Sequence, residues 1–209
     1  MRTISDKGLN LLIEWEGERL EAYDDARPNV KLAPNDKVLG TLTIGVGHTG
    51  SDVYIGQKIS KEESRQILLT DLQKYEDAVY NSVRVPLNDN QFDALVIFAF
   101  NVGVNQFKTS TLLQLLNQGK YQEVPKQLAR WNKTTINGKT VVDQGLTNRR
   151  AKEIALWNTL VIQTQPQPTK WWNKLLGTLT IGVGHTASDV YIGQKISKRI
   201  CLDSSLLIF

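Results

Sequence analysis

Two carboxylate side chains near the start of the chain, Glu16 and Asp25, stand nine residues apart. Glu16 falls on the apolar stripe of a predicted helix, where burial disfavours its charged form, whereas Asp25 lies in a polar turn and would stay ionised. Hydrolysis of a glycosidic bond uses such a pair, because one carboxyl protonates the leaving oxygen while an ionised group acts at the oxocarbenium-like centre. The pair is therefore a candidate for glycoside hydrolysis.

A simpler interpretation of each residue stays open, and spacing alone favours it. A Glu on an apolar stripe commonly forms an ion pair, here with Arg19, and an Asp in a turn is commonly a solvated turn former. Asp24 precedes Asp25 directly, and only the nine-residue distance from Glu16 favours the second of these aspartates. Asp24 therefore remains an alternative for the second carboxylate.

The segments around this pair predict a mainly helical chain with little β-structure. A first helix begins at a cap on Thr3 or Ser5 and ends at Gly17. The alternating, glycine-rich residues 39–47 predict a small β unit with Leu42, Ile44 and Val46 on one face and Thr43 on the other. A polar connection joins the two. The carboxylates would thus lie between a helix end and a short strand.

Helical patterns fill most of the following hundred residues. The capping boxes SKEE at 60–63 and NDNQ at 88–91 each open a helix, and Pro86 ends the first. Further helices are expected near 109–118, 121–131 and 147–160, and Asn137-Gly138 predicts a hairpin over 134–142. These elements predict an α+β fold that is predominantly helical.

Longer stretches carry a resemblance to a known family. EGERLEAYDD at 16–25, followed by TLTIGVGHT at 41–49, resembles the active-site signature of phage-type lysozymes, the endolysins of glycoside hydrolase family 24. FAFNVG at 98–103 and GLTNRRAKEIALW at 145–157 resemble helical-lobe segments of the same family. The similarity extends from about residue 5 to 158.

The resemblance implies a two-lobed lysozyme-like fold, in which a small β lobe and a helical lobe are joined by the long helix from Ser60. It implies Glu16 as the general acid, with Asp25 and Thr43 positioning the attacking water, and Asn101 and Arg149 as substrate-binding residues. A helix cap or a surface ion pair is an equally open interpretation of the last two.

The reaction that the resemblance implies is hydrolysis of the β-1,4 bond between N-acetylmuramic acid and N-acetylglucosamine in peptidoglycan, with lysis of the host cell as its role. A positioned water favours inversion, whereas a shorter distance between the carboxyls would favour a covalent intermediate on Asp25. A lytic transglycosylase is the alternative enzyme. A non-hydrolytic, membrane-active protein that binds the wall through its basic end is the alternative from another class.

Several other features bear on the chemistry. The connection from Ala26 to Leu42 is longer than in the shortest family members, which alters how the site is covered. A lone His after a strand is more often structural than catalytic, so His48 is left out of the mechanism. With His185 as the second histidine and Cys201 as the one cysteine, neither a metal site nor a cofactor is expected.

The end of the chain differs in composition from the rest. QTQPQPT at 163–169 is typical of a linker. The predicted layout is a lysozyme domain at 1–160, a Pro/Gln linker at 161–169 and a basic tail at 170–209. Residues 176–198 of the tail repeat 39–61 with one difference, Ala187 for Gly50. No counterpart of Glu16 or Asp25 precedes this copy, so it does not form a second active site.

Three interpretations of the tail stay open: a surface appendage, a strand that pairs with its original, and a membrane contact. The last rests on KWWNKLL at 170–176, whose aromatic and cationic side chains suit weak contact with a membrane or lipopolysaccharide. The net charge of +4 suits a polyanionic partner, and the expected one is peptidoglycan rather than nucleic acid. No signal peptide or membrane span is expected, so the protein would be in the host cytoplasm and act on the wall after release. A monomer is expected.

Overall fold

The computed structural model describes residues 2–136 and 138–159, together with residues 180–181 and 185–186. The chain divides into two compact units, Met1–Val161 and Ile162–Phe209. The first unit contains all of the candidate site residues.

Seven α-helices are described in the first unit. They are α1 (Asp6–Glu16), α2 (Lys61–Ser82), α3 (Asp89–Val102), α4 (Val104–Thr109), α5 (Thr111–Asn117), α6 (Val124–Ala129) and α7 (Gln144–Asn158). A short 3-10 turn, η1 (Tyr121–Glu123), precedes α6. The described strands are β1 (Arg19–Asp24), β2 (Leu42–Gly45), β3 (His48–Thr49), β4 (Lys133–Ile136) and β5 (Lys139–Val142). The prediction of a predominantly helical α+β fold is confirmed.

Helix starts follow the capping signals of the sequence. The Ser60 hydroxyl accepts from the N–H of Glu63 while the Glu63 carboxylate accepts from the N–H of Ser60, and Asn88 and Gln91 form the same reciprocal pair at α3. Each pair satisfies backbone donors that the first turn of a helix leaves free. Both predicted capping boxes are therefore confirmed.

A three-stranded antiparallel sheet, in the order β1-β2-β3, forms the small β lobe. Tyr23 pairs with Thr43, and Thr43 pairs in turn with Thr49. Ala22, Ile44 and Val53 form a small core of their own under this sheet. Thr43 and Ile44 are both buried although they point to opposite faces, so the sheet is covered on both sides at this point.

Strand β1 was not predicted, since only a polar connection was expected between the first helix and residues 39–47. Exposure alternates along this strand, with Ala22 and Asp24 buried, and the pairing with β2 shifts between Arg19 and Tyr23. Tyr23 lies at a less buried position and Asp24 at a buried one, which is the reverse of what their hydrophobicity predicts. Asp24 ends the strand, and Asp25 follows it.

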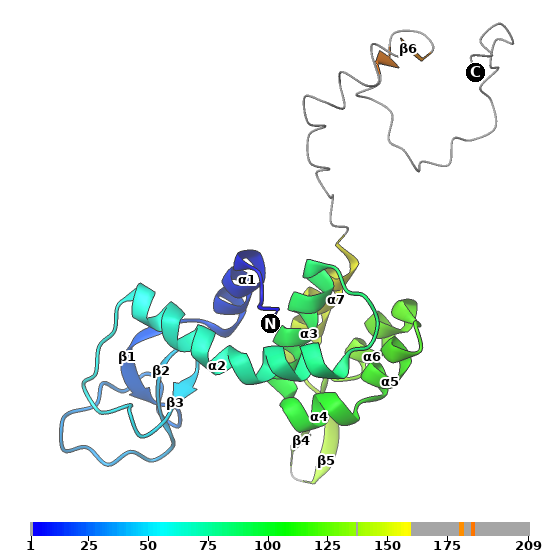
Figure 1. Ribbon diagram of the computed structural model, residues 1–209. Coiled ribbons are helices and arrows are strands. Elements are labelled where there is room, and N and C mark those ends of the chain that lie inside the picture. The colour runs from blue at the N-terminus through cyan, green and yellow to red at the C-terminus, as the bar shows by residue number, and fades with distance from the viewer. Residues whose placement is uncertain (1, 137, 160–179, 182–184, 187–209) are drawn as a thin grey trace, which may run out of the picture. The chain divides into compact units, whose positions relative to one another are not determined.

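Figure 1 shows α2 extending from the sheet β1–β3 to the helices of the second lobe. There α3 is the central element, with Phe92 and Phe98 among its fully buried residues, and α7 packs against it. A buried helix of this kind reads as apolar all round, which is the pattern from Phe92 onward. The helical lobe is therefore built around α3.

Two helix boundaries differ from the prediction. The helix expected near 109–118 is α5, which begins at Thr111 because Ser110 caps it by accepting from the N–H of Leu113, and the short α4 before it was not predicted. The last helix begins at Gln144 rather than near 147, because Asp143 serves as its N-cap. In both cases a single capping side chain sets the boundary.

The copied segment in the second unit forms two short strands, β6 (Thr180–Ile181) and β7 (His185–Thr186). Thr180 pairs with Thr186 and Ile181 with His185, which is the register of β2 and β3. Identical sequence has thus produced the same local pairing. The remaining residues of the tail, including KWWNKLL, and of the linker lie outside the described residues.

Candidate active site

Glu16 is the last residue of α1, where Gly17 ends the helix with φ 80 and donates its N–H to the Ile13 carbonyl. Its side chain is 20% exposed, so it is neither in the core nor free in solvent. Both carboxylate oxygens accept hydrogen bonds from the guanidinium of Arg149, one of them from Nη2 at 3.0 Å. The ion-pair alternative with Arg19 was wrong about the partner.

Arg149 reaches Glu16 from α7, across 133 positions of sequence. The hydrogen bonds with Glu16 raise the pKa of this guanidinium, and partial burial opposes them. A guanidinium holds a carboxylate with two parallel hydrogen bonds, which fixes its direction as well as its distance. The end of α1 is therefore attached to the helical lobe through the candidate acid.

A pocket of about 560 Å³ lies on the same side, beside Arg149. Its walls come from α1, the end of α3, the hairpin and the start of α7. The lining residues are Trp15, Asn101, Thr134, Asp143, Gly145, Leu146, Asn148, Arg149 and Lys152. The two predicted substrate-binding residues, Asn101 and Arg149, are thus brought to one pocket. Amide, cationic and aromatic side chains in a single concave site suit a polar, ring-shaped ligand such as a sugar.

A buried ion pair supports this pocket from behind, and the sequence analysis missed it. Arg150 donates from Nη2 to Glu153 at 2.6 Å and to the Asn101 side-chain oxygen at 2.8 Å, and its guanidinium lies 5.2 Å from the centre of the Phe98 ring. Burial raises the pKa of Glu153, and the attraction of Arg150 opposes this. Arg150 thereby fixes which way the Asn101 amide points.

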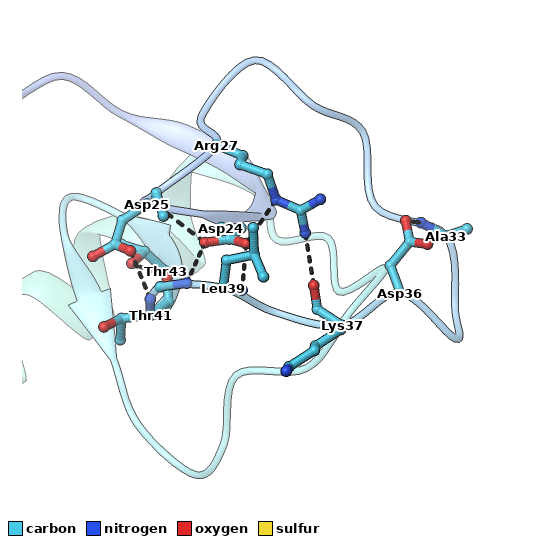
Figure 2. A network of polar contacts seen from close by, with 11 residues as sticks. Asp24, Asp25, Arg27, Ala33, Asp36, Lys37, Leu39, Thr41 and Thr43 are labelled. Carbon is cyan, nitrogen blue, oxygen red and sulfur yellow. Dashed lines mark hydrogen bonds and ion pairs between the residues drawn. The ribbon is translucent and has the colours of Figure 1, made fainter.

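Asp24 and Asp25 have opposite environments (Figure 2). Asp24 is fully buried and accepts hydrogen bonds from the N–H groups of Leu39, Gly40 and Ala26. The hydrogen bond from Leu39, helped by the others, lowers the pKa of Asp24 although burial opposes this. Asp25 is exposed. Only Asp25 has a carboxylate that faces solvent, so the structure favours it over the alternative Asp24.

Thr43 lies on β2, close to Asp25 on the sheet side of the molecule (Figure 2). Its side chain is buried, and its hydroxyl donates to the Thr41 carbonyl at 3.2 Å. The same carbonyl accepts from the N–H of Asp25 at 3.0 Å. Asp25 and Thr43 therefore share one backbone carbonyl as a common partner, which sets their relative position.

His48 has a structural environment. Its Nδ1 lies 2.8 Å from an Asp71 oxygen on α2, and its Nε2 lies 3.0 Å from Asp52. Burial alone would lower the pKa of His48, but the hydrogen bonds with the two aspartates raise it. Both ring nitrogens are occupied, so this side chain joins β3 to α2. The expectation that His48 is structural rather than catalytic agrees with this geometry.

The candidate residues thus form two groups. Glu16, Arg149 and Asn101 belong to the helical side, and Asp25 and Thr43 to the sheet side. Among the described residues no hydrogen bond or ion pair joins the two groups. Nor does this part of the chain contain a group of three or more His, Cys, Asp or Glu side chains placed to bind a metal ion. What the arrangement offers is carboxylates and their hydrogen-bond partners.

A small sheet and a helical lobe connected by one long helix, with a carboxylate at the end of the first helix and a second after the first strand, define a class of protein. It is the lysozyme-type glycoside hydrolase domain. Comparison with known proteins gives the family.

Residues 13–153 match the family model described as Phage lysozyme, and the chain belongs to this family. It is 43% identical to the endolysin of Bacillus phage PZA over 156 aligned residues, and these residues make up 75% of this chain. It is 42% identical over 201 residues to the endolysin of Bacillus phage B103, covering 96% of this chain and 71% of that protein. The predicted membership of the phage-type lysozymes is confirmed.

A solved structure supports the same conclusion. The muramidase domain of SpmX from Asticcacaulis excentricus superposes with a TM-score of 0.66 at 35% identity, covering 77% of this chain and all of that one. The chain spans 55% of the length of the PZA endolysin. Among the helices that the structure describes, none is both long enough and apolar enough to cross a membrane.

Proposed function

We propose that this chain is an endolysin that hydrolyses the β-1,4 bond between N-acetylmuramic acid and N-acetylglucosamine of peptidoglycan and so causes lysis of the host cell. The observation that carries the proposal is the position of Glu16 at the end of α1, with Arg149 on one side and a polar pocket beside it. Membership of the phage lysozyme family supports peptidoglycan as the substrate.

Glu16 is the proposed general acid. To act, one of its oxygens must carry a proton and turn from Arg149 toward the glycosidic oxygen. Partial burial at 20% exposure leaves room for the substrate to reach this carboxyl. Arg149 then has a second role, because it holds the Glu16 side chain in one direction while the substrate binds.

Asp25 and Thr43 are the proposed partners of a water molecule that attacks the anomeric carbon. An exposed carboxylate accepts a proton from that water, and the Thr43 hydroxyl, whose own proton goes to the Thr41 carbonyl, has lone pairs with which it accepts from the water and orients it. The Thr41 carbonyl between them keeps the two groups in register. Attack by a water from this side would invert the anomeric configuration.

The pocket lined by Asn101 and Arg149 is the proposed binding site for the sugar on the helical side. The amide of Asn101 can both donate to and accept from hydroxyl and N-acetyl groups. Its direction is fixed by Arg150, so the amide does not need to be ordered when substrate binds. The half-buried Trp15 adds an aromatic surface at the same pocket.

The test is a comparison of Glu16→Gln with Glu14→Gln. Both change one carboxylate of α1 to an amide, but Glu14 is exposed, whereas Glu16 is partly buried and binds Arg149. Loss of the general acid should lower the rate of release of soluble fragments from purified peptidoglycan by about 10²–10⁴-fold. The Glu14 variant should keep the wild-type rate. Equal rates for the two variants would overturn the assignment of Glu16.

Mass spectrometry of the fragments identifies the bond. Reducing N-acetylmuramic ends are expected from the intact protein. Reducing N-acetylglucosamine ends would keep a hydrolase but change the bond, and anhydro ends would replace the water-positioning roles by the internal ring closure of a transglycosylase. Products formed in H₂¹⁸O and analysed for anomeric configuration distinguish inversion from retention.

The proposed organisation is a lysozyme domain at 1–160, a linker at 161–169 and a basic tail at 170–209, acting as a monomer without a cofactor. The tail would add at most a weak contact with membrane or lipopolysaccharide. Release from the host cytoplasm to reach the wall belongs to the same proposal, which the relatives named endolysin support.

A further inference from the structure

Asp24 holds the returning end of the long connection between β1 and β2. It is fully buried at the end of β1, and each carboxylate oxygen accepts from one backbone N–H of residues 39–40: Oδ2 from Leu39 at 2.8 Å and Oδ1 from Gly40 at 2.9 Å. The Ala26 N–H donates to Oδ1 at 3.1 Å. The start and the end of the connection therefore meet at one buried anion.

The next N–H in the chain binds the next aspartate. Thr41 donates to Oδ1 of Asp25 at 2.6 Å, directly after Leu39 and Gly40 have donated to Asp24. Three successive backbone N–H groups thus bind two successive carboxylates, as Figure 2 shows. The direction of the Asp25 side chain depends on where residues 39–41 lie, and Asp24 determines where they lie.

Gly40 provides an independent observation. A Cβ atom at this position would lie 2.0 Å from Oδ1 of Asp25 and 2.8 Å from the backbone nitrogen of Ala26. No real side chain tolerates such a contact, so the Asp25 carboxylate lies directly against bare backbone. The absence of a side chain at Gly40 is therefore needed for the observed position of Asp25.

The rest of the connection is attached to the same centre. Arg27 donates from Nε to Oδ2 of Asp24 at 3.2 Å and from Nη2 to the Lys37 carbonyl at 2.7 Å. Further along, the Asp36 carboxylate accepts from the N–H of Ala33 at 2.7 Å. The two Arg27 contacts join Asp24 to Lys37 near the end of the connection, whereas the contact of Asp36 with Ala33 is a local turn within it.

We propose that Asp24 is a positioning residue for Asp25: with Gly40, it holds residues 39–41 so that the Thr41 N–H orients the Asp25 carboxylate beside Thr43. The proposal rests on the proposed function, in which Asp25 and Thr43 position the attacking water. It assigns to the longer connection a role in catalysis, since the segment supplies the hydrogen-bond donors that fix the second carboxylate.

An aspartate suits this role because both of its oxygens only accept, and all four neighbouring groups only donate. An asparagine has the same size, but its NH₂ group would replace one of the two oxygens. That NH₂ group would face a backbone N–H, so two buried donors would lie opposite each other. Residues 39–41 would then move away from Asp24, and Asp25 would lose the direction that Thr41 gives it. The binding pocket on the helical side would not change.

The experiment compares Asp24→Asn, Gly40→Ala and the control Asp36→Asn in the full-length chain. Asp36 lies in the same connection and also accepts a backbone N–H, but it has no contact with residues 39–41 in the described hydrogen bonds. On soluble, uncross-linked glycan strands, the first two variants should lower kcat by on the order of 10–100-fold with little change in KM. Asp36→Asn should keep both constants.

A purely structural role would not give this separation of kcat from KM. Amide hydrogen exchange followed by NMR provides the second readout: the N–H groups of Leu39 and Gly40 should exchange faster in Asp24→Asn while the core of the helical lobe stays protected. A folded Asp24→Asn with wild-type kcat would overturn the proposal. So would a loss of kcat that Asp36→Asn shares.

Gly40→Ala decides the question where Asp24→Asn fails to fold, because it keeps Asp24 and disturbs Asp25 directly. Lower kcat at unchanged melting temperature supports the positioning role, and wild-type kcat refutes it. If the proposed function itself is wrong, the wild-type chain and Glu14→Gln will also release no fragments. That result is distinct from a loss of activity in the Asp24 and Gly40 variants alone, and it would overturn the positioning role as well.

Discussion

At the scale of single residues, His48 shows how ionisation is coupled to stability. The contacts with Asp71 and Asp52 raise its pKa above the value of about 6.5 in an unfolded chain. A raised pKa in the folded state means that protonated His48 stabilises the fold. This contribution is fully present below about pH 6.5 and is lost as the pH rises through the folded pKa.

His48→Gln should therefore destabilise the protein more at pH 5.5 than at pH 9. The glutamine retains one donor and one acceptor but does not gain a charge at low pH. Melting temperatures of both proteins, measured by circular dichroism at several pH values, give the difference directly. A difference that is constant with pH would show that His48 contributes packing and neutral hydrogen bonds but no charge.

Gly8 provides a second test at this scale. Exchange of glycine for alanine within a helix usually stabilises it by roughly 0.5–1 kcal/mol. Here a Cβ atom would lie 2.5 Å from the carboxyl carbon of Asp93, whose buried side chain accepts the Ser5 N–H. Gly8→Ala should instead destabilise by about 1–3 kcal/mol in urea unfolding. Glu14→Ala, at an exposed position of the same helix, is the control, and a stabilised Gly8→Ala would contradict the contact.

What the sequence revealed of these residues was limited by distance along the chain. The signature motif identified Glu16, Asp25 and Thr43 as one set, because it is local. The partner of Glu16 could not be inferred, since Arg149 lies 133 positions away and only the packing of α7 brings it close. Asp24 is buried and Asp25 is exposed, but the sequence could not show which is which, because the two adjacent residues are chemically identical.

At the scale of elements, the contact between α3 and α7 contains the buried pair of Arg150 and Glu153. Arg150 Nε and Nη1 and the second oxygen of Glu153 have no hydrogen-bond partner there. Because these atoms are unsatisfied, the attraction within the pair offsets little of the free energy that it costs to remove both side chains from water. Its retention fits a positional role, because the same guanidinium fixes the Asn101 amide at the pocket.

Arg150→Met should lower the free energy of unfolding by up to about 3–5 kcal/mol, because it leaves the Glu153 carboxyl buried without its partner. The double variant Arg150→Met with Glu153→Leu should recover most of this loss. Both variants should weaken substrate binding and raise KM, since Asn101 is no longer oriented in either. A double variant with wild-type KM would show that Asn101 does not depend on Arg150.

The helices and strands that could be predicted are those that a few adjacent residues identify. Both capping boxes and the β4–β5 hairpin rest on a few adjacent residues, and they were predicted correctly. Strand β1 was missed because its last two residues reverse the expected pattern: the polar Asp24 is buried, whereas Tyr23 is only partly buried. Helix α4 was not predicted, because its six residues are too few to show a helical period.

At the scale of the whole molecule, the two groups of candidate residues belong to parts with separate cores. Ala22, Ile44 and Val53 form the small core of the sheet, whereas the large cluster belongs to the helices, with α2 extending from one part to the other. The contact of His48 on β3 with Asp71 on α2 attaches the sheet to the connecting helix, and it therefore matters for the relative position of the carboxylates.

Removal of the tail tests whether the lysozyme domain is sufficient. The fragment 1–169 keeps Thr159, whose carbonyl accepts from Asn90 on α3, and it keeps every candidate site residue. Its melting temperature should lie within about 2 °C of the full chain, a change in stability below about 1 kcal/mol. Its rate of fragment release from purified peptidoglycan should also be unchanged, because the copied segment has no counterpart of Glu16 or Asp25.

Killing of intact cells is the readout that separates the two parts. Glu16→Gln should remove wall degradation and killing together if hydrolysis is the cause, and the fragment 1–169 should retain both. If the basic tail acted on membranes by itself, the result would be reversed: Glu16→Gln would still kill, and the fragment would degrade purified walls without killing. Assaying both proteins on walls and on cells in parallel therefore assigns the activity to one part of the chain.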